Sequence, residues 1–390
     1  MDAQPSIAGP RAASAARSLF DAIAPRSDEI ERARSVPADL IERMNRAGLF
    51  KLTIPRIYGG DEVQPVEVLQ TIEEVAYADS SVGWCCMIYL TTAVNVAFLE
   101  PAWAERIYRC QGERTPITAG STTPVGKARP VAGGMQVSGV WPWGSGTHHC
   151  DWIAGTAMLP GARADGPPVP TVFYFPRDEV ELLDDWDASG LCGTGSGSFR
   201  VESAVVPEGR WVPLGGARRH LEGVLYRFPF FGLFSAGIAA VPLGLARRAL
   251  DDFVELARVK VPTWKTRTIN ESSVVQLELG RAEALISGAR HQLYAIVEEL
   301  TGRVAAGDEL SLEDRRRIRL AACQATASCA EAVDRLYDAG GGSSVYKSCS
   351  LQRHWRDIHT ATAHRMVGTQ TLQLAGAVKL LGRAPGDALL

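Results

Sequence analysis

The chain has 390 residues, of which 46% are hydrophobic and 22% charged, so it is expected to fold rather than to be disordered. Its formal net charge of −3 supplies no basic surface, and we expect no nucleic-acid partner. Eight cysteines occur without a CxxC pair, and a chain of this length needs no disulfide scaffold. We therefore expect reduced thiols in a cytoplasmic protein, with no signal peptide at residues 1–5.

Residues 1–115 are predicted to form an N-terminal helical domain. The Ala-rich residues 12–24 and the apolar runs 66–78 and 84–99 follow helical periodicity. Another helix is expected to begin near Pro37, because proline is favoured in a first helical turn.

Residues 116–220 are predicted to form a small central β domain. Glycine, proline, valine, threonine and tryptophan dominate, and the long helical stripes disappear. Gly133-Gly134 precedes an alternating run and predicts a hairpin turn. Strands are expected over residues 135–141, 152–158, 171–175 and 198–206. We expect these strands to form an antiparallel sheet or barrel.

Residues 221–390 are predicted to form a C-terminal helical bundle. Long helical stretches are expected at about 233–260, 274–304, 311–338 and 351–382. Their lengths and short connections favour an antiparallel four-helix bundle. Residues 228–246 carry no charge and approach the length of a membrane span. Their glycines and prolines, and the charged sequence that follows, favour a buried helix, so no membrane association is expected.

Residues 141–152 combine three tryptophans, two histidines and a Ser-Gly turn. Indole rings can cover a flat conjugated ligand, while glycine admits close approach of the backbone. Tryptophans near a strand end are also typical of a protein core, so the segment alone leaves both interpretations open. The adjacent His148 and His149 would point to opposite faces of a strand, and no metal site is expected.

A second polar motif lies near the C-terminus. Arg353, Asp357, Thr360 and His364 are spaced i, i+4, i+7 and i+11, which places them on one stripe of the helix expected over residues 351–382. Apolar flanking residues indicate a largely buried helix, whose polar side chains must find partners or line a pocket. An imidazole can donate or accept a proton near pH 7, although a structural hydrogen-bonded histidine is the alternative.

The order of helices, small β domain and helical bundle resembles the acyl-CoA dehydrogenase superfamily. The local motifs are similar to one branch, the flavin-dependent monooxygenases that act as oxygenase components of two-component systems. The matching stretches follow in the family's order: Pro55 with Tyr58-Gly59-Gly60; Ser81-Val82-Gly83-Trp84; Ser121 with Pro124 and Gly126; Gly133-Gly134; Trp141-Pro142-Trp143-Gly144-Ser145-Gly146 with Trp152; Gly190-Leu191 with Gly193-Thr194-Gly195-Ser196; and Gln352-Arg353-His354-Trp355-Arg356-Asp357 with His359 and His364. The resemblance implies a mainly α fold with a central β domain.

The resemblance also implies a mechanism. In this branch, reduced FMN or FAD comes from a separate reductase and reacts with O2 through a flavin C4a-(hydro)peroxide to hydroxylate a small molecule. Ser145 matches a catalytic serine beside flavin N5, and His364 matches a catalytic histidine near C4a. The further cofactor-binding positions implied are Trp143, Ser121, Thr122, Thr123, Gly146, Asp357 and, at the phosphate, Arg267. For Arg267 an exposed salt bridge is the alternative. Relatives are commonly homotetramers, so a homo-oligomer is expected.

The substrate pocket departs from the pattern of phenol-hydroxylating relatives. These relatives carry a histidine, in the helix after the Gly-Trp motif, that deprotonates the phenol. Thr92 or Asn95 stands at that place here, and with Tyr89 they are the expected substrate-binding residues. The missing base favours an electron-rich ring that needs no deprotonation, such as an indole. N-oxygenation of an amine is an alternative.

A second alternative is an acyl-CoA dehydrogenase-like oxidoreductase. That branch needs a glutamate to remove an α-proton, often in a Tyr-Glu-Gly-Thr motif near the C-terminus, and no such motif follows Arg353. Glu271 or Glu278 could serve as a displaced glutamate. A third alternative, a non-catalytic scaffold, is disfavoured because Ser145 and His364 are both present.

Overall fold

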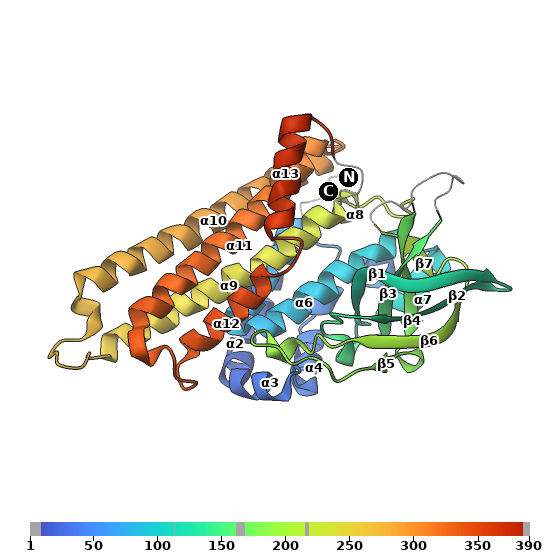
Figure 1. Cartoon of the computed structure of the whole chain (residues 1–390). Coiled ribbons are helices and arrows are strands. Elements are labelled where there is room, and N and C mark those ends of the chain that lie inside the picture. The colour runs from blue at the N-terminus through green and yellow to red at the C-terminus, as the bar shows by residue number, and fades with distance from the viewer. Residues whose placement is uncertain (1–8, 113, 161–167, 215–217, 385–390) are drawn as a thin grey trace. The chain divides into compact units, whose positions relative to one another are not determined.

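The computed structural model of the chain describes residues 9–112, 114–160, 168–214 and 218–384 (Figure 1). The chain divides into two compact units. The first comprises Met1–Val68, Cys85–Asp187 and Cys192–Phe230, and the second comprises Leu69–Trp84, Ala188–Leu191 and Phe231–Leu390. The absence of a signal peptide is a prediction about residues 1–5, which lie outside the described part of the chain.

Short helices precede the sheet along the chain. They are α1 (Gly9–Ser18), α2 (Phe20–Ile23), α3 (Ser27–Ala33), α4 (Ala38–Arg46), α5 (Pro65–Ala78), α6 (Ser80–Ala93) and α7 (Pro101–Tyr108). The helix expected near Pro37 is α4, whose N-cap is Pro37 itself. Its apolar side chains Leu40, Ile41 and Met44 are buried, as the spacing of an amphipathic helix requires.

The first unit contains a seven-stranded sheet in the described part of the chain, with the order β5-β6-β2-β1-β3-β4-β7. The strands are β1 (Thr118–Val131), β2 (Gly134–Trp141), β3 (Trp152–Leu159), β4 (Val169–Pro176), β5 (Glu181–Leu182), β6 (Phe199–Val206) and β7 (Trp211–Pro213). The turn expected at Gly133-Gly134 joins β1 to β2, and Val131 pairs with Gly134. The antiparallel prediction is wrong in one respect, because β1 and β3 run parallel and make the sheet mixed. The connection over residues 142–151 reverses the direction of the chain after β2 and places β3 on the other side of β1. Strand β3 therefore runs in the same direction as β1.

Trp141 lies in the core of this sheet. Its side chain is fully buried, its indole stacks on Phe199, and its ring N–H donates to the Thr156 carbonyl at 2.8 Å. Three glycines surround the indole: a Cβ would lie 2.5 Å from the ring at Gly126, 2.9 Å at Gly139 and 2.8 Å at Gly155. These residues are therefore glycine because the indole fills the space that their side chains would occupy.

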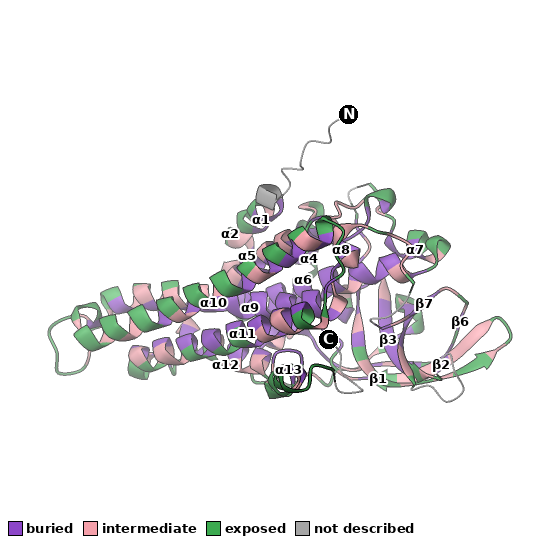
Figure 2. Ribbon diagram, turned by 90° about the horizontal axis from the view of Figure 1, so that it is seen from above, coloured by how far each residue is buried: buried purple, intermediate pink, exposed green. Residues whose placement is uncertain are grey.

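The second unit contains the long helices of the bundle. They are α9 (Phe230–Val259), α10 (Ser273–Ala305), α11 (Leu312–Gly340), α12 (Ser350–Thr362) and α13 (Thr369–Leu381), preceded in the chain by α8 (Val224–Arg227) of the first unit. Helices α9, α10, α11 and α12 lie side by side in both ribbon views, and most of the first half of α9 is buried (Figures 1 and 2). The expected four-helix bundle is confirmed.

The continuous helix expected over residues 351–382 is wrong, because the helix breaks between Thr362 and Thr369. Local hydrogen bonds replace helical ones in this break. The backbone N–H of Met366 donates to His364 Nδ1, and the Thr371 hydroxyl donates to the Arg365 carbonyl. His364 therefore lies beyond the end of α12 and does not continue the stripe of Arg353, Asp357 and Thr360.

A buried carboxylate joins three helices of the second unit. Glu73 of α5 is fully buried and accepts hydrogen bonds from Arg247 of α9 at 2.6 Å and from Arg290 of α10 at 2.8 Å. The Tyr294 hydroxyl of α10 donates to the other oxygen at 2.6 Å. Gly244 of α9 approaches the Glu73 carbonyl so closely that a Cβ would meet it at 2.2 Å. Charge pairing and close helix contact thus occur at the same place.

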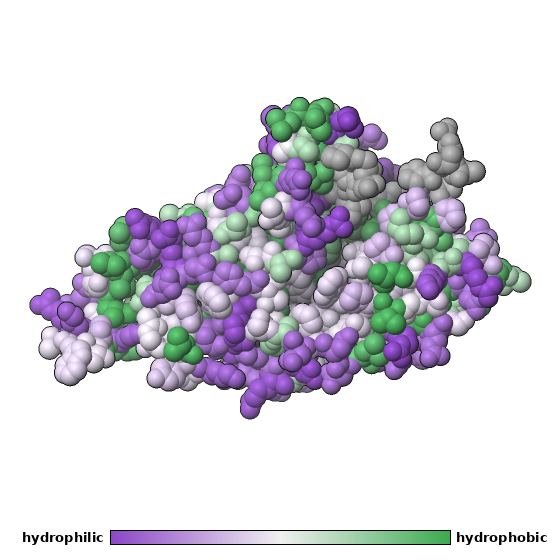
Figure 3. All heavy atoms as spheres, viewed as in Figure 1, coloured by the Kyte–Doolittle hydropathy of each residue, from purple (hydrophilic) through white to green (hydrophobic). Residues whose placement is uncertain are grey.

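Two helical stretches in the described part of the chain are strongly apolar. Residues 80–98 and 230–259 are long and apolar enough to cross a membrane, but most of each apolar window is buried within the protein, as in a core helix. By contrast, α13 carries three exposed leucines, Leu372, Leu380 and Leu381. Hydrophobic side chains gather over α13 at the top of the space-filling view (Figure 3).

Candidate active site

The Ser145 turn follows β2 and is fastened to a second glycine-rich segment of the first unit. The Gly144 N–H donates to the Gly197 carbonyl, and the Gly146 N–H donates to the Thr194 carbonyl, both at 2.9 Å. These two bonds lie on either side of Ser145. They fix the backbone from which its side chain projects, and at residues 147–149 the chain continues into the 3-10 helix η5 (Thr147–His149).

Three buried hydroxyl groups form a chain beside this turn. Ser145 Oγ lies 2.7 Å from Ser196 Oγ, and Ser196 Oγ lies 2.6 Å from Thr194 Oγ1. The three residues are 6%, 5% and 2% exposed. In the sequence, Gly193-Thr194-Gly195-Ser196 stands only as one of the stretches that carry the family resemblance. The sequence Thr194-Gly195-Ser196 shows that two hydroxyl groups are present. It does not show that they lie beside Ser145, which is about fifty residues earlier in the chain.

Gly146 has a structural reason to be glycine. Its φ is +71°, and a Cβ there would lie 2.6 Å from the hydroxyl oxygen of Tyr89. That hydroxyl donates to the Gly146 carbonyl at 2.9 Å, and the Tyr89 ring packs edge-on against Phe50. The structure thus brings Tyr89, an expected substrate residue, into contact with the Ser145 turn. A role for either residue toward a ligand stays a prediction.

The three tryptophans of the segment fall in different environments. Trp141 is core, and Trp152 is half-buried beneath the guanidinium of Arg210. Trp143 is 64% exposed and has a φ of +60°, which is unfavourable for a residue with a side chain. An exposed indole on a strained backbone is accessible to a ligand, as the backbone strain of a functional site would require. Of the three, Trp143 is therefore the indole available to cover a ligand.

The predicted cofactor residues Ser121, Thr122 and Thr123 lie where β1 is irregular. The pairing of β1 with β3 shifts register between Ser121 and Gly126. Ser121 is buried, and its hydroxyl accepts from the Thr123 N–H at 3.3 Å, whereas Thr122 is exposed. At this irregularity the Ser121 carbonyl accepts from the Thr156 hydroxyl at 2.9 Å, so a side chain replaces a ladder partner.

The positions that replace the expected base lie against a tyrosine cluster. Asn95 is buried and forms a side-chain hydrogen bond with Tyr174. The Tyr174 hydroxyl accepts from Tyr108, whose hydroxyl also lies 3.4 Å from the Thr92 carbonyl. Thr92 itself is half-buried. Burial raises the pKa of Tyr174 to about 12, so this cluster offers neutral hydroxyls and no base at pH 7.

His364 belongs to the second unit and is held as one tautomer. Its Nδ1 accepts from the Met366 N–H at 3.2 Å, which leaves the ring proton on Nε2. The rings of Trp84 and Phe234 lie edge-on to the imidazole at centroid distances of 5.7 and 5.8 Å. Burial, followed by the charge of Arg319, lowers the pKa of His364 from 6.5 to about 4. At pH 7 it is therefore a neutral hydrogen-bond donor rather than an acid.

Arg319 of α11 was missed in the sequence, because nothing local links it to residues 363–368. It is 2% exposed, and its Nη2 donates to the Thr371 hydroxyl at 2.9 Å and contacts Met366 Sδ at 3.6 Å. Burial lowers its own pKa to about 10, so it stays cationic at pH 7. It thus supports the segment that carries His364 and disfavours protonation of that ring.

Asp357 uses its carboxylate to hold residues 188–191 against α12. One oxygen accepts from the Leu191 N–H at 2.7 Å, and the other accepts from the Ser80 hydroxyl. The next residue, Arg356, donates to the Ser189 carbonyl at 2.6 Å, and a Cβ on Gly190 would lie 2.2 Å from the Arg356 carbonyl. Burial raises the pKa of Asp357 to about 6. Both oxygens therefore have protein partners, and a cofactor contact stays a prediction.

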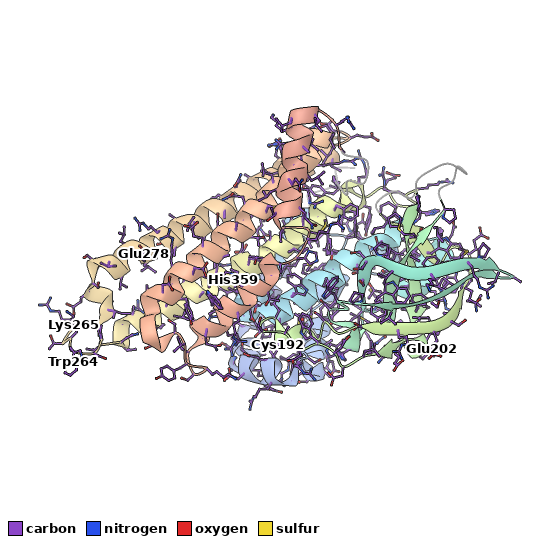
Figure 4. All side chains as sticks on the ribbon, viewed as in Figure 1. Cys192, Glu202, Trp264, Lys265, Glu278 and His359 are labelled. Carbon is purple, nitrogen blue, oxygen red and sulfur yellow. The ribbon has the colours of Figure 1, made fainter. Side chains whose placement is uncertain are left out.

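Arg267 and the two candidate glutamates form surface ion pairs. Arg267 lies 3.4 Å from Glu271, and both side chains are more than half exposed. Its neighbours Trp264 and Lys265 extend from the connection between α9 and α10, while Glu278 lies on α10 (Figure 4). Glu278 accepts from Arg281 and Arg335, each at 2.7 Å. Carboxylates stabilised by arginines are poor bases for an α-proton, which weighs against the dehydrogenase alternative.

Comparisons with known proteins identify the family. Residues 12–99 match the N-terminal domain model of acyl-CoA dehydrogenase, and residues 236–369 match its C-terminal domain model. The chain is 30% identical to a pigment production hydroxylase of Rhodococcus erythropolis, over 93% of this chain and 94% of that protein. It is 28% identical to an indole-3-acetate monooxygenase of Pseudomonas putida, over 99% of both chains.

A solved structure extends the agreement to three dimensions. The crystal structure of the HsaA monooxygenase from Mycobacterium tuberculosis matches with a TM-score of 0.87 and 26% identity, covering 98% of this chain and 100% of that one. In sequence, HsaA is described as the oxygenase subunit of a flavin-dependent monooxygenase and is 27% identical over 95% of both chains. The order of elements, both domain models and these relatives agree: the chain belongs to the acyl-CoA dehydrogenase superfamily and, within it, to the flavin-dependent monooxygenases of two-component systems.

Proposed function

We propose that the protein uses reduced FMN or FAD and O2 to hydroxylate an aromatic small molecule of the indole type. The observation that carries the proposal is the pairing of an exposed, conformationally strained Trp143 with the buried hydroxyl of Ser145 two residues later. An indole face suits an isoalloxazine ring, and a fixed hydroxyl suits its polar N5 edge. Irregular β1, with the hydroxyls of Ser121, Thr122 and Thr123, supplies further polar groups for the cofactor.

When bound, reduced flavin supplies the two electrons with which one oxygen atom of O2 enters the substrate and the other leaves as water. The chain's own residues would bind and orient the reactants. Ser145 would hold the N5 edge of the flavin. His364 would donate a hydrogen bond from Nε2 to the reactants near flavin C4a while remaining uncharged. The apolar rings around His364 exclude water, which preserves that hydrogen bond.

The substrate class rests on the chemistry of the tyrosine cluster and on one relative. Tyr89, Thr92 and Asn95 provide no group that is basic at pH 7, so a phenol would not be deprotonated there. An indole ring is electron-rich without ionisation. The relative from Pseudomonas putida is named for indole-3-acetate, which agrees with this class.

Oxygen incorporation tests the proposal. The protein is mixed with a flavin reductase, NAD(P)H, indole and 18O2, and one labelled atom is expected in the product. Trp143→Ala should weaken the affinity for reduced flavin about tenfold, the scale of one aromatic contact, with an unchanged melting temperature. Val140→Ala, at an exposed neighbouring position in β2, is the control. Reoxidation of flavin at the rate of free flavin, without oxygenated product, would contradict the proposal.

We also propose a cytoplasmic homo-oligomer, with a tetramer as the expected form, that receives flavin from a separate reductase. The three exposed leucines of α13 support self-association, because burial of apolar side chains against a partner is favourable. Mass photometry at nanomolar concentration should detect a species larger than a monomer. A monomer at all concentrations up to the micromolar range would count against this part of the proposal.

A further inference from the structure

Helix α6 places two side chains against the backbone that carries Ser145. Cys85 and Tyr89 are four residues apart and therefore share one face of the helix. The Tyr89 hydroxyl donates to the Gly146 carbonyl at 2.9 Å, and the Cys85 thiol donates to the Thr194 carbonyl at 3.7 Å. The Gly146 N–H donates to that same Thr194 carbonyl. The helix thus contacts both of the segments whose pairing fixes the Ser145 turn.

The Gly146 carbonyl depends mainly on Tyr89. It also accepts from the His149 N–H at 3.2 Å and from the Cys150 thiol at 3.5 Å. The phenolic O–H at 2.9 Å is the strongest of the three donors, because a thiol is a weak donor and the bond from His149 is longer. Tyr89 and Cys150 are 2% and 5% exposed, so bulk water does not compete for this carbonyl.

The Tyr89 ring also limits where the turn can lie. Gly146 has a φ of +71°, and the three atoms nearest to a Cβ there all belong to Tyr89, at 2.6 to 2.8 Å. Phe50, itself 2% exposed, packs edge-on against the same ring at a centroid distance of 5.2 Å. Burial is the main reason that the pKa of Tyr89 lies well above its usual value, so the hydroxyl remains a donor at pH 7.

The same stretch of chain carries the two positions expected at the substrate. Thr92 follows Tyr89 by three residues, about one turn of α6, and Asn95 lies in η4 (Val94–Phe98), which follows α6 directly. All of these residues belong to the first unit. A short helical stretch is rigid, so the contact of Tyr89 with Gly146 joins the substrate positions to the Ser145 turn.

We propose that Tyr89 is a positioning residue that sets the place of the Ser145 turn relative to the substrate positions Thr92 and Asn95. It acts through the Gly146 carbonyl, which differs from the substrate contact expected for it in the sequence. The inference rests on the proposed function, in which this turn holds the flavin. Oxygen transfer needs a fixed separation of the two reactants, and a small displacement is costly.

Tyr89→Phe removes only the hydroxyl and should uncouple the reaction. Reduced flavin would still reduce O2, by two electrons and two protons, to hydrogen peroxide and become oxidised flavin, with no oxygen atom entering the substrate. The ratio of hydroxylated indole to hydrogen peroxide should fall about fivefold, the scale of one net hydrogen bond. The KM for indole should change less than about twofold, because substrate binding itself is untouched.

Amide hydrogen exchange of the flavin-free protein gives a second readout that needs no turnover. Peptides within residues 143–150 should exchange about fivefold faster in Tyr89→Phe, because local opening loses one hydrogen bond. Peptides of β3 and β4 should keep their wild-type rates. Unchanged exchange at residues 143–150 would overturn the inference.

Tyr226→Phe is the matched control. Tyr226 is also 2% exposed, belongs to the same unit, and donates its hydroxyl to a backbone carbonyl, that of Thr53, at 3.2 Å. This variant should keep the wild-type product ratio and the wild-type exchange at residues 143–150. If Tyr89→Phe does not fold, Cys150→Ala decides: it should shift both readouts in the same direction but less, and no shift would overturn the inference.

The outcomes separate the inference from the proposed function. A wild-type product ratio in Tyr89→Phe, or an equal fall in Tyr226→Phe, would overturn the inference and leave the proposed function intact. A raised KM for indole with an unchanged product ratio would also overturn it, since Tyr89 would then bind the substrate. If the wild type with indole forms only hydrogen peroxide, the proposed function fails, whereas hydrogen exchange still tests the contact of Tyr89 with the turn.

Discussion

His364 should resist protonation, and this has a measurable effect on folding. Its pKa is about 4 in the folded protein, mainly because of burial and then because of Arg319, against 6.5 for an ordinary histidine. A difference of about 2.5 pH units corresponds to about 3 kcal/mol against ionisation in the folded state. Between pH 6.5 and 4 the unfolded chain binds more protons at this position, so stability must fall as the pH falls through that window.

Comparison of wild type with His364→Gln isolates this contribution. Between pH 7.5 and pH 5, the wild type should lose about 2 kcal/mol of unfolding free energy that the variant does not lose. Asp357 acts in the opposite direction, because its raised pKa of about 6 lets the folded protein take up a proton first. His149, whose pKa burial lowers to about 4, acts in the same direction as His364. Both groups are present in wild type and variant, so they cancel in the difference.

The assay is urea denaturation at each pH, with side-chain NMR of 13C,15N-histidine as an independent readout. The NMR signal absent from His364→Gln assigns the residue, and its Nδ1 should be unprotonated at pH 7. Arg319→Met should raise the pKa of His364 but leave it below 6.5, because burial is the larger cause. A His364 that titrates near pH 6.5, or that carries its proton on Nδ1, would refute the reasoning.

Four further results are expected. Gly155→Ala should destabilise the sheet by about 1–3 kcal/mol in chemical denaturation, because its Cβ would overlap the buried indole. Gly288→Ala, in an open position on α10, should stabilise the protein by up to about 1 kcal/mol, and a loss there would contradict this account. Glu73→Gln should lower the unfolding free energy by about 3 kcal/mol, since two arginines lose a buried partner; Glu299→Gln, in an exposed pair with an arginine, should cost less than about 1 kcal/mol. In steady-state assays with indole, His364→Gln should retain more activity than His364→Ala, because an amide N–H can replace a neutral Nε2–H; equal losses would argue against the donor role.

The order of elements was predictable because hydrophobic periodicity changes where the sheet begins and where it ends. Helices of the bundle and strands such as β3 and β6 were recognisable from local pattern alone. Strand β1 was not, since Pro124, Gly126 and Pro130 interrupt its apolar alternation. Its parallel pairing with β3 depends on residues that are distant in sequence.

The candidate site shows the same division between local and distant causes. The sequence shows two tryptophans, Trp141 and Trp143, at the end of one predicted strand. Which of the two indoles is buried depends on glycines in three different strands, and the local sequence does not show these contacts. The break after Thr362 depends on hydrogen bonds of His364 and on Arg319 of another helix. The sequence pattern predicted one continuous helix there, because helix-forming alanines and leucines stand both before and after the break. Ser196 and Thr194 were likewise present in a matching stretch of the sequence, but their contact with Ser145 could be found only in the structure.

The glycines around Trp141 imply a pattern of epistasis. At Gly155 the three nearest atoms to an added Cβ all belong to the Trp141 indole, so Gly155→Ala should be harmful in the natural background and tolerated beside a smaller residue at position 141. Conversely, a smaller residue at position 141 would by itself leave a cavity. Alanine in place of Gly155 would then fill part of that cavity. Variation at these positions should therefore be correlated, and a homologue with leucine in place of this tryptophan would be expected to carry alanine in place of one of the glycines.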